Sequence, residues 1–96
     1  MSNTPTDDTL LEQKPSVASM FRLQFEEAQD SWVLLYPEGM VKLNPSAAEI
    51  LKRCDGERSI SEIIEQLEKE FGAEDLKNDV TSFIDIALEQ RWITLG

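Results

Sequence analysis

The chain has 96 residues and carries 19 acidic against 9 basic side chains, which gives a formal net charge of −10 at neutral pH. A chain of this length forms one domain, and such a domain buries only about 60–65% of the surface that its unfolded chain exposes. There is no histidine and only one cysteine, which excludes an imidazole base, a Cys-His pair, a Cys/His zinc site and an internal disulfide. We therefore expect no catalytic residue, no metal site and no cofactor.

The sequence shows no sign of export or of membrane insertion. The unpaired Cys54 gives no indication of an oxidising compartment, and the N-terminus lacks a basic region followed by an apolar core. The longest uninterrupted apolar run is the five residues 32–36, whereas a membrane-spanning helix needs about 20. We predict a cytoplasmic protein that does not contact a membrane.

The N-terminal residues 1–16 are polar and contain two prolines. Their only large apolar side chains are Met1, Leu10 and Leu11, which is too little apolar surface to offset the entropy of ordering the segment. The composition predicts a flexible arm over residues 1–16 and a folded domain over residues 17–96.

The first half of this domain has the alternation of β-strands. In residues 20–26 every second side chain is large and apolar, namely Phe21, Leu23 and Phe25. This period of two predicts a strand with one buried face. Residues 32–36 are apolar throughout, with aromatic and branched side chains, and predict a central strand that is covered on much of both faces.

A tight turn follows the predicted central strand. Pro37 fixes its own φ angle and Gly39 accepts a positive φ, so residues 37–39 suit a turn between two antiparallel strands. Residues 40–43 then form a short third strand. The first half of the domain is predicted to be a three-stranded antiparallel meander.

Helical signals begin directly after the third strand. Asn44 is a favoured N-cap and Pro45 is favoured at the first helical position, so a first helix is expected from there until Asp55-Gly56 ends it. Cys54 lies on the apolar stripe of this helix. We interpret it as a small core residue in preference to a nucleophile.

Two further helices are predicted. Ser59 and Glu62 have the spacing of a capping box, and Gly72 supplies the stop of that second helix. A third helix is expected over about residues 74–90, with acidic side chains in its first turn. The predicted fold class is α+β and winged-helix-like, with the three-stranded antiparallel β-meander followed by three α-helices.

A winged-helix fold raises the alternative of DNA binding, which the charges oppose. The third predicted helix would be the recognition helix, yet it holds five acidic side chains against Lys77 alone, a net charge of −4 over residues 74–90. Phosphate binding needs a stripe of Lys and Arg. The only basic group, Lys52 and Arg53 with Arg58, is interpreted as solvated surface charge.

Two other functions are weighed and disfavoured. Asp30-Ser31 superficially resembles the attachment site of an acyl carrier protein, but it precedes a strand, so a turn serine is the favoured interpretation. Paired carboxylates could act as acid and base, but the glutamates of the second helix lie on a surface where solvation is expected.

The third predicted strand leaves one side of the sheet unpaired. In a meander the last strand pairs with the central strand on one side only, and its free edge can accept a peptide strand. The strand is short and carries one lysine, which suits protection against aggregation as well as peptide capture. On the third helix, Ile86 lies beside the centre of the apolar stripe, on the Phe83 side. It either lines a groove or packs against the N-terminal arm or Trp92.

Several segments resemble one known family. They are WVLLYPEG at residues 32–39, AAEIL at residues 47–51, CDGER at residues 54–58, and Asp79-Val80 before Phe83. In this combination and spacing they resemble the PqqD family, the peptide chaperones of pyrroloquinoline quinone (PQQ) biosynthesis. The resemblance covers about residues 15–93.

The resemblance implies a RiPP recognition element, a winged-helix-like module that captures the leader of a ribosomally made precursor peptide. In that family the precursor PqqA is presented to the radical SAM enzyme PqqE, and the chaperone itself performs no chemistry. Members usually dock the leader as an added strand beside the third strand and against the third helix. Carried onto this chain, the implied peptide-binding residues are Met40, Val41, Lys42 and Leu43 on the strand and Phe83, Ile86, Ala87 and Gln90 on the helix.

The negative charge is concentrated in the C-terminal half. Eleven acidic and four basic side chains give −7 over residues 55–96, while eight and five give −3 over residues 1–54. The acidic outer faces of the last two helices are therefore candidates for a second interface, with the modifying enzyme. We expect a monomer that does not bind nucleic acid; a swapped dimer is the alternative use of the free edge, and a winged-helix DNA-binding or other protein-interaction module is the alternative function.

Overall fold

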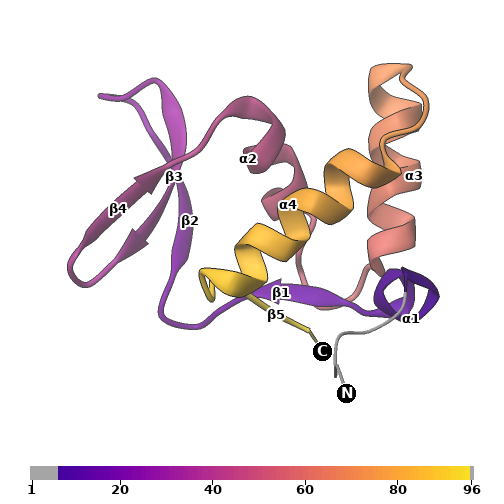
Figure 1. Cartoon of the computed structure of the whole chain (residues 1–96). Coiled ribbons are helices and arrows are strands. Elements are labelled where there is room, and N and C mark those ends of the chain that lie inside the picture. Colours follow the sequence, from indigo (N-terminus) through magenta and orange to yellow (C-terminus); the bar gives the residue numbers. More distant parts are fainter. Residues whose placement is uncertain (1–6, 96) are drawn as a thin grey trace.

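The structure, a computed structural model, describes residues 7–95. A three-stranded sheet lies on one side of the molecule and the main helices lie on the other, as Figure 1 shows. The elements in chain order are α1 (Asp7–Glu12), β1 (Pro15–Val17), β2 (Arg22–Glu26), β3 (Ser31–Tyr36), β4 (Gly39–Lys42), α2 (Pro45–Lys52), α3 (Ile60–Phe71), α4 (Lys77–Glu89) and β5 (Ile93–Leu95). The predicted α+β fold is confirmed.

The sheet has the predicted meander order, β2-β3-β4, with both pairs antiparallel. Leu34 of β3 lies between Leu23 of β2 and Val41 of β4, and all three side chains face the helices. Val33 and Leu34 are both fully buried although they point to opposite faces. The prediction of a central strand covered on both faces is therefore confirmed.

The first strand differs from its prediction in two ways. It begins at Arg22, two residues later than expected, because Phe21 lies in a turn in which its N–H donates to the Ala18 carbonyl. Phe25 remains 43% exposed, although it packs edge-on against Trp32 with ring centroids 5.7 Å apart. The alternation placed Phe25 on the buried face of the strand, whereas this exposure shows that its side chain is only partly covered.

The start of α2 and both ends of α3 are fixed by the predicted local signals, but α2 ends at Lys52, before the predicted stop at Asp55-Gly56, because the N–H groups of Arg53 and Cys54 donate to carbonyls only three residues back. The Asn44 side chain accepts the Ala47 N–H at 2.8 Å, and Pro45 occupies the first helical position. Ser59 and Glu62 form the capping box, each side chain accepting the other residue's backbone N–H. Gly72 ends α3 in the left-handed conformation, with φ of 61°. Short-range hydrogen bonds explain why these boundaries are readable from sequence.

The start of α4 was predicted wrongly. The helix begins at Lys77 and not at residue 74, because Asp75 adopts a φ of 60° that no α-helix accommodates. The Leu76 N–H is held instead by the Glu68 side chain of α3, at 3.0 Å. Of the acids expected in its first turn, only Asp79 is there.

The flexible arm predicted for residues 1–16 is also wrong where the structure describes it, from residue 7 onward. These residues form α1 and β1, and β1 pairs antiparallel with β5 at the other end of the chain. Leu10 and Pro15 are buried, and the carbonyls of Gln13 and Pro15 accept the N–H groups of Ile60 and Gly56. Counting apolar side chains missed these backbone hydrogen bonds. Residues 1–6 lie outside the described part of the chain.

The core lies between the sheet and the helices. It is built from side chains of every helix together with Leu34, Leu43, Cys54 and Ile93. Figure 1 shows the paired strands β1 and β5 together below α4, at the end of the molecule opposite the α3–α4 turn. Among residues 7–95, no helix is long and apolar enough to cross a membrane.

Candidate functional site

The outer edge of β4 presents unpaired backbone groups. The Leu43 N–H donates to the Trp32 carbonyl at 3.0 Å, so Leu43 belongs to the hydrogen-bonded class of pairs in this ladder. Because these pairs alternate with non-hydrogen-bonded ones, the backbone of Val41 points toward β3, whereas that of Met40 and Lys42 points away from it. Within the described chain β4 pairs with β3 alone. Two N–H groups and two carbonyls thus line a free edge.

The side chains of β4 divide between the two faces of the sheet. Val41 packs against the core, and Met40 and Lys42 lie exposed on the opposite face, with Met40 45% exposed. A peptide strand along this edge would align its own side chains alternately with these two faces. One face would offer an apolar contact beside Val41 and the other a cation at Lys42.

The other edge of the sheet, β2, has the opposite phase. Since β3 uses its Val33 and Leu35 backbone groups for β2, the residues opposite them, Gln24 and Arg22, point their backbones inward. Leu23 and Phe25 therefore present the outward groups of β2. The sheet therefore has two open edges, and each edge has its own outward-pointing amides: those of Met40 and Lys42 on β4, and those of Leu23 and Phe25 on β2.

On α4, the residues expected to form the groove wall have different environments. Ile86 is 51% exposed and Gln90 is exposed, while Phe83 is half-buried against the core. Trp92 packs on Phe83, with ring centroids 6.2 Å apart, and does not cover Ile86. Of the two alternatives for Ile86, lining a groove agrees with this exposure better than packing against Trp92 does.

Two residues implied by the resemblance belong to the core instead. Ala87 is completely buried, and its carbonyl accepts the Trp92 N–H at 2.8 Å. Leu43 is only 6% exposed, and its backbone N–H is used within the sheet. Their side chains are therefore part of the core and are not available to contact a peptide. Val41 and Phe83 both pack against the hydrophobic core.

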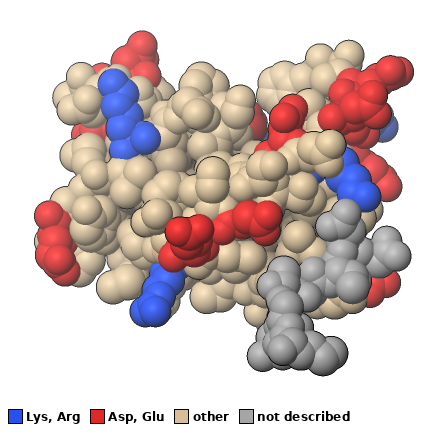
Figure 2. All heavy atoms as spheres, in the orientation of Figure 1, with Lys and Arg blue, Asp and Glu red and all other residues tan. Residues whose placement is uncertain are grey.

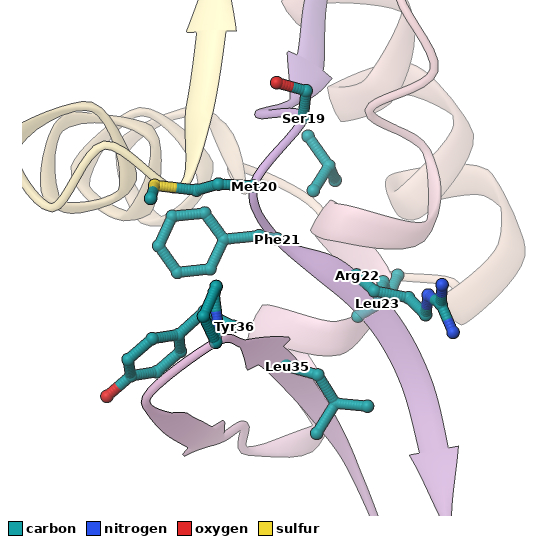
Figure 3. Close-up of a pocket in the computed structure, with 9 residues that line it drawn as sticks. Ser19, Met20, Phe21, Arg22, Leu23, Leu35 and Tyr36 are labelled. Atoms are coloured by element: carbon teal, nitrogen blue, oxygen red, sulfur yellow. The ribbon is translucent and has the colours of Figure 1, made fainter.

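A shallow hollow of about 520 Å³ lies where the β1–β2 connection meets the sheet. Figure 3 shows Met20, Phe21 and Tyr36 pointing to one side of the strands, with Arg22 and Leu35 pointing to the other. The rings of Phe21 and Tyr36 lie 5.5 Å apart. Sequence reasoning did not predict this hollow, which lies between residues 17–23 and 35–37.

A second hollow, here called the α2–α4 pocket, measures about 560 Å³ and is mainly apolar. It lies between the start of α2, the end of α3 and the start of α4. Its lining consists of Pro45, Ser46, Glu49, Ile50, Leu67, Phe71, Ala73, Leu76, Asp79, Val80 and Ser82. Phe71, at the end of α3, is 57% exposed.

The basic side chains expected as solvated surface charge form ion pairs. Lys52 and Arg53 both contact Glu49, and Arg53 also reaches Glu70 of α3. These hydrogen bonds, from Arg53 first and Lys52 second, hold the pKa of Glu49 below its ordinary value. Arg58 pairs with Asp55. Lys52 additionally lies over the Trp32 ring, 5.2 Å from its centroid.

The single thiol is unsuited to nucleophilic chemistry. Cys54 is 5% exposed, its Sγ contacts the Ile50 carbonyl oxygen at 3.3 Å, and burial raises the pKa of the thiol to about 12. The interpretation of Cys54 as a core residue is confirmed. Within residues 7–95, no group of three His, Cys, Asp or Glu side chains is placed to hold a metal ion.

Comparisons with known proteins identify relatives of the chain. The model of the family described as coenzyme PQQ synthesis protein D (PqqD) matches residues 31–93. A protein of Methylococcus capsulatus named PqqA binding protein is 44% identical over 86 residues, covering 90% of this chain and 88% of that protein. A protein of the same name from Azotobacter vinelandii is 48% identical over 89 residues, covering 92% and 97%.

The fold is similar to a solved structure. It is the solution NMR structure of the PqqD truncation of Methylobacterium extorquens PqqCD, described as a functional and stand-alone RiPP recognition element. The TM-score is 0.69 at 28% sequence identity, with 83% of this chain and 87% of that chain covered. Family model, sequence relatives and fold agree, and the chain belongs to the PqqD family.

Proposed function

We propose that this protein binds the leader of the precursor peptide PqqA and presents the peptide to the radical SAM enzyme PqqE in PQQ biosynthesis. Relatives that match about 90% of this chain are named PqqA binding proteins, and a protein of similar fold is a RiPP recognition element. The role is that of a non-catalytic binding module. We further propose that it acts as a cytoplasmic monomer.

The free edge of β4 is the observation that carries this proposal. A leader strand beside β4 would meet the outward N–H and carbonyl groups of Met40 and Lys42, which allows up to four backbone hydrogen bonds. Each such bond contributes about 0.5–1.5 kcal/mol, whereas micromolar binding requires about 8 kcal/mol after the costs of ordering. Backbone pairing alone is therefore too weak to account for binding, and its role is to fix the direction and register of the peptide.

Apolar contacts must supply the remaining free energy. Ile86 is the large apolar side chain on the exposed face of α4, and half of it is available to a ligand. Leader side chains buried against Ile86 and the exposed part of Phe83 would contribute about 25 cal/mol per Å². The proposed site thus consists of the β4 edge for pairing and of Ile86, Phe83 and Gln90 for the α4 wall.

Titration calorimetry with synthetic PqqA tests the proposal. Ile86→Asp places a charge on the proposed wall and should weaken binding at least tenfold. Two exposed sites serve as controls: Glu65→Ala on α3, and Met20→Asp, which makes the same apolar-to-acidic change in the β1–β2 connection. Both controls should stay within about twofold of the unsubstituted protein. Equal affinities for Ile86→Asp and the controls would refute the α4 wall, and no binding by the unsubstituted protein would refute the function.

A further inference from the structure

The α2–α4 pocket has an apolar floor that is open to the surface. Ile50, Leu67 and Val80 form this floor and are otherwise buried, at 5%, 4% and 2% exposed. Phe71 stands at its lip with 57% of its surface exposed. Exposed apolar surface of this kind in a small, highly charged protein indicates a contact with a ligand or partner.

The pocket is in line with the proposed peptide site. Along α4, Asp79 and Ser82 line the pocket, and Ile86 and Gln90 follow them at intervals of three or four residues, so all four lie on one face of the helix. On the opposite wall, Pro45 of α2 follows Lys42 of β4 after only two residues. Both walls of the proposed groove therefore lead into the pocket.

The rim of the pocket is acidic, which favours an occupant that carries a Lys or Arg next to the group that enters the pocket. The charge of Glu49 is compensated by Lys52 and Arg53, but Asp79 has no ion-pair partner among residues 7–95. Glu74 and Asp75 lie just before α4 in the turn that borders the pocket. Figure 2 shows acidic side chains gathered over the end of α3, beside a notch in the upper outline of the molecule.

We infer that the α2–α4 pocket is a specificity pocket for the bound peptide, which receives one large apolar side chain of a leader segment that also carries a Lys or Arg. This inference rests on the proposed function. The segment lies beyond the part that pairs with β4. The apolar side chain contacts Ile50, Leu67 and Val80, and the neighbouring cation lies near Asp79.

Two variants should hinder the occupant of this pocket without altering its floor: one blocks the mouth, and the other repels a cation at the rim. Ser46→Trp adds a large ring at the exposed mouth, and Asp79→Lys reverses the charge of the rim. Asp85→Lys is the matched control, because Asp85 is exposed on the same helix but points away from the pocket, six positions after Asp79. Circular dichroism melts establish that each variant is folded before binding is measured.

The test is titration calorimetry of the full chain with synthetic PqqA at low and at physiological salt. Ser46→Trp should weaken binding about tenfold or more and Asp79→Lys about threefold or more, with the Asp79→Lys effect shrinking at higher salt. Asp85→Lys should stay within about twofold. If the unsubstituted protein binds PqqA and all three variants bind equally well, the inference is overturned while the proposed function stands.

A pocket used by the modifying enzyme gives a different result. Ser46→Trp would then bind PqqA normally but lose association with PqqE in a pull-down of the purified proteins, which would also overturn the inference. Failure of the unsubstituted protein to bind PqqA would refute the proposed function and, with it, the peptide pocket.

Discussion

Val41 lies opposite Leu34 across the β3–β4 ladder, and both side chains pack against the core. This pairing fixes the phase of β4. The side chain of Val41 points to the core, and its backbone N–H and carbonyl point toward β3. The flanking Met40 and Lys42 therefore present their backbone groups at the free edge. The core thereby determines which two residues can hold an added strand.

Replacing one outward N–H should weaken peptide binding without disrupting the sheet. Lys42→Pro removes a donor that faces away from β3, and proline is tolerated on the outer side of an edge strand. We expect Lys42→Pro to bind PqqA about two- to twelvefold more weakly than Lys42→Ala, which keeps the N–H but removes the same charge. Calorimetry of the two variants measures this difference, and equal affinities would show that the β4 edge does not pair with the peptide.

Residues 7–17 should stabilise the domain. Leu10 is 8% exposed in the core, so Leu10→Ala should lower the free energy of unfolding by about 2–5 kcal/mol. Glu12→Ala, an exposed change in the same helix, is the control and should have little effect. Urea denaturation measures both variants. A Leu10→Ala protein as stable as the control would support the flexible arm predicted from composition.

Stability should fall with acid through the capping box of α3. The Ser59 N–H that donates to the Glu62 carboxylate lowers the pKa of Glu62 below its ordinary 4.5 in the folded state. The stabilisation is therefore complete above the unfolded pKa and is lost as the pH falls through the folded one. Glu62→Gln keeps a capping partner but does not titrate. We expect its melting temperature to fall less steeply below about pH 4.5; a slope identical to that of the unsubstituted protein would contradict the role of Glu62.

Gly72 should be required for its backbone conformation. At a φ of 61° it ends α3, and a Cβ atom at this position would meet no heavy atom within 4 Å. Gly72→Ala should therefore cost about 1–2 kcal/mol through backbone strain alone. Gly72→Asn should cost less, because asparagine tolerates the left-handed region. Thermal denaturation compares the two, and the reverse order would contradict the strain account.

Features fixed by nearby residues were predictable from the sequence. The caps at Asn44, Ser59 and Gly72 depend on hydrogen bonds that span at most four residues, and they are confirmed. The β1–β5 pair was missed because Pro15 and Leu95 lie 80 residues apart and neither segment is long or periodic. A three-residue strand is too short to show an alternation of apolar and polar residues, so it is recognised only from its pairing with another strand.

The candidate site shows the same division. The resemblance implied Phe83, Ile86, Ala87 and Gln90 as the helix wall, but the sequence could not tell which of them the core would cover. Trp92 packs on Phe83, and Ala87 is buried beneath its own helix, whereas Ile86 remains exposed. The α2–α4 pocket was not predictable, since it depends on how three helices meet.

Hydrogen exchange of assigned backbone amides, measured with and without PqqA, tests the central claim most directly. The sheet has two free edges, and their outward amides are those of Met40 and Lys42 on β4 and of Leu23 and Phe25 on β2. Pairing of the peptide with β4 predicts that exchange at Met40 and Lys42 slows by at least tenfold while Leu23 and Phe25 are unchanged. Protection that develops at Leu23 and Phe25, with none at Met40 and Lys42, would contradict the account.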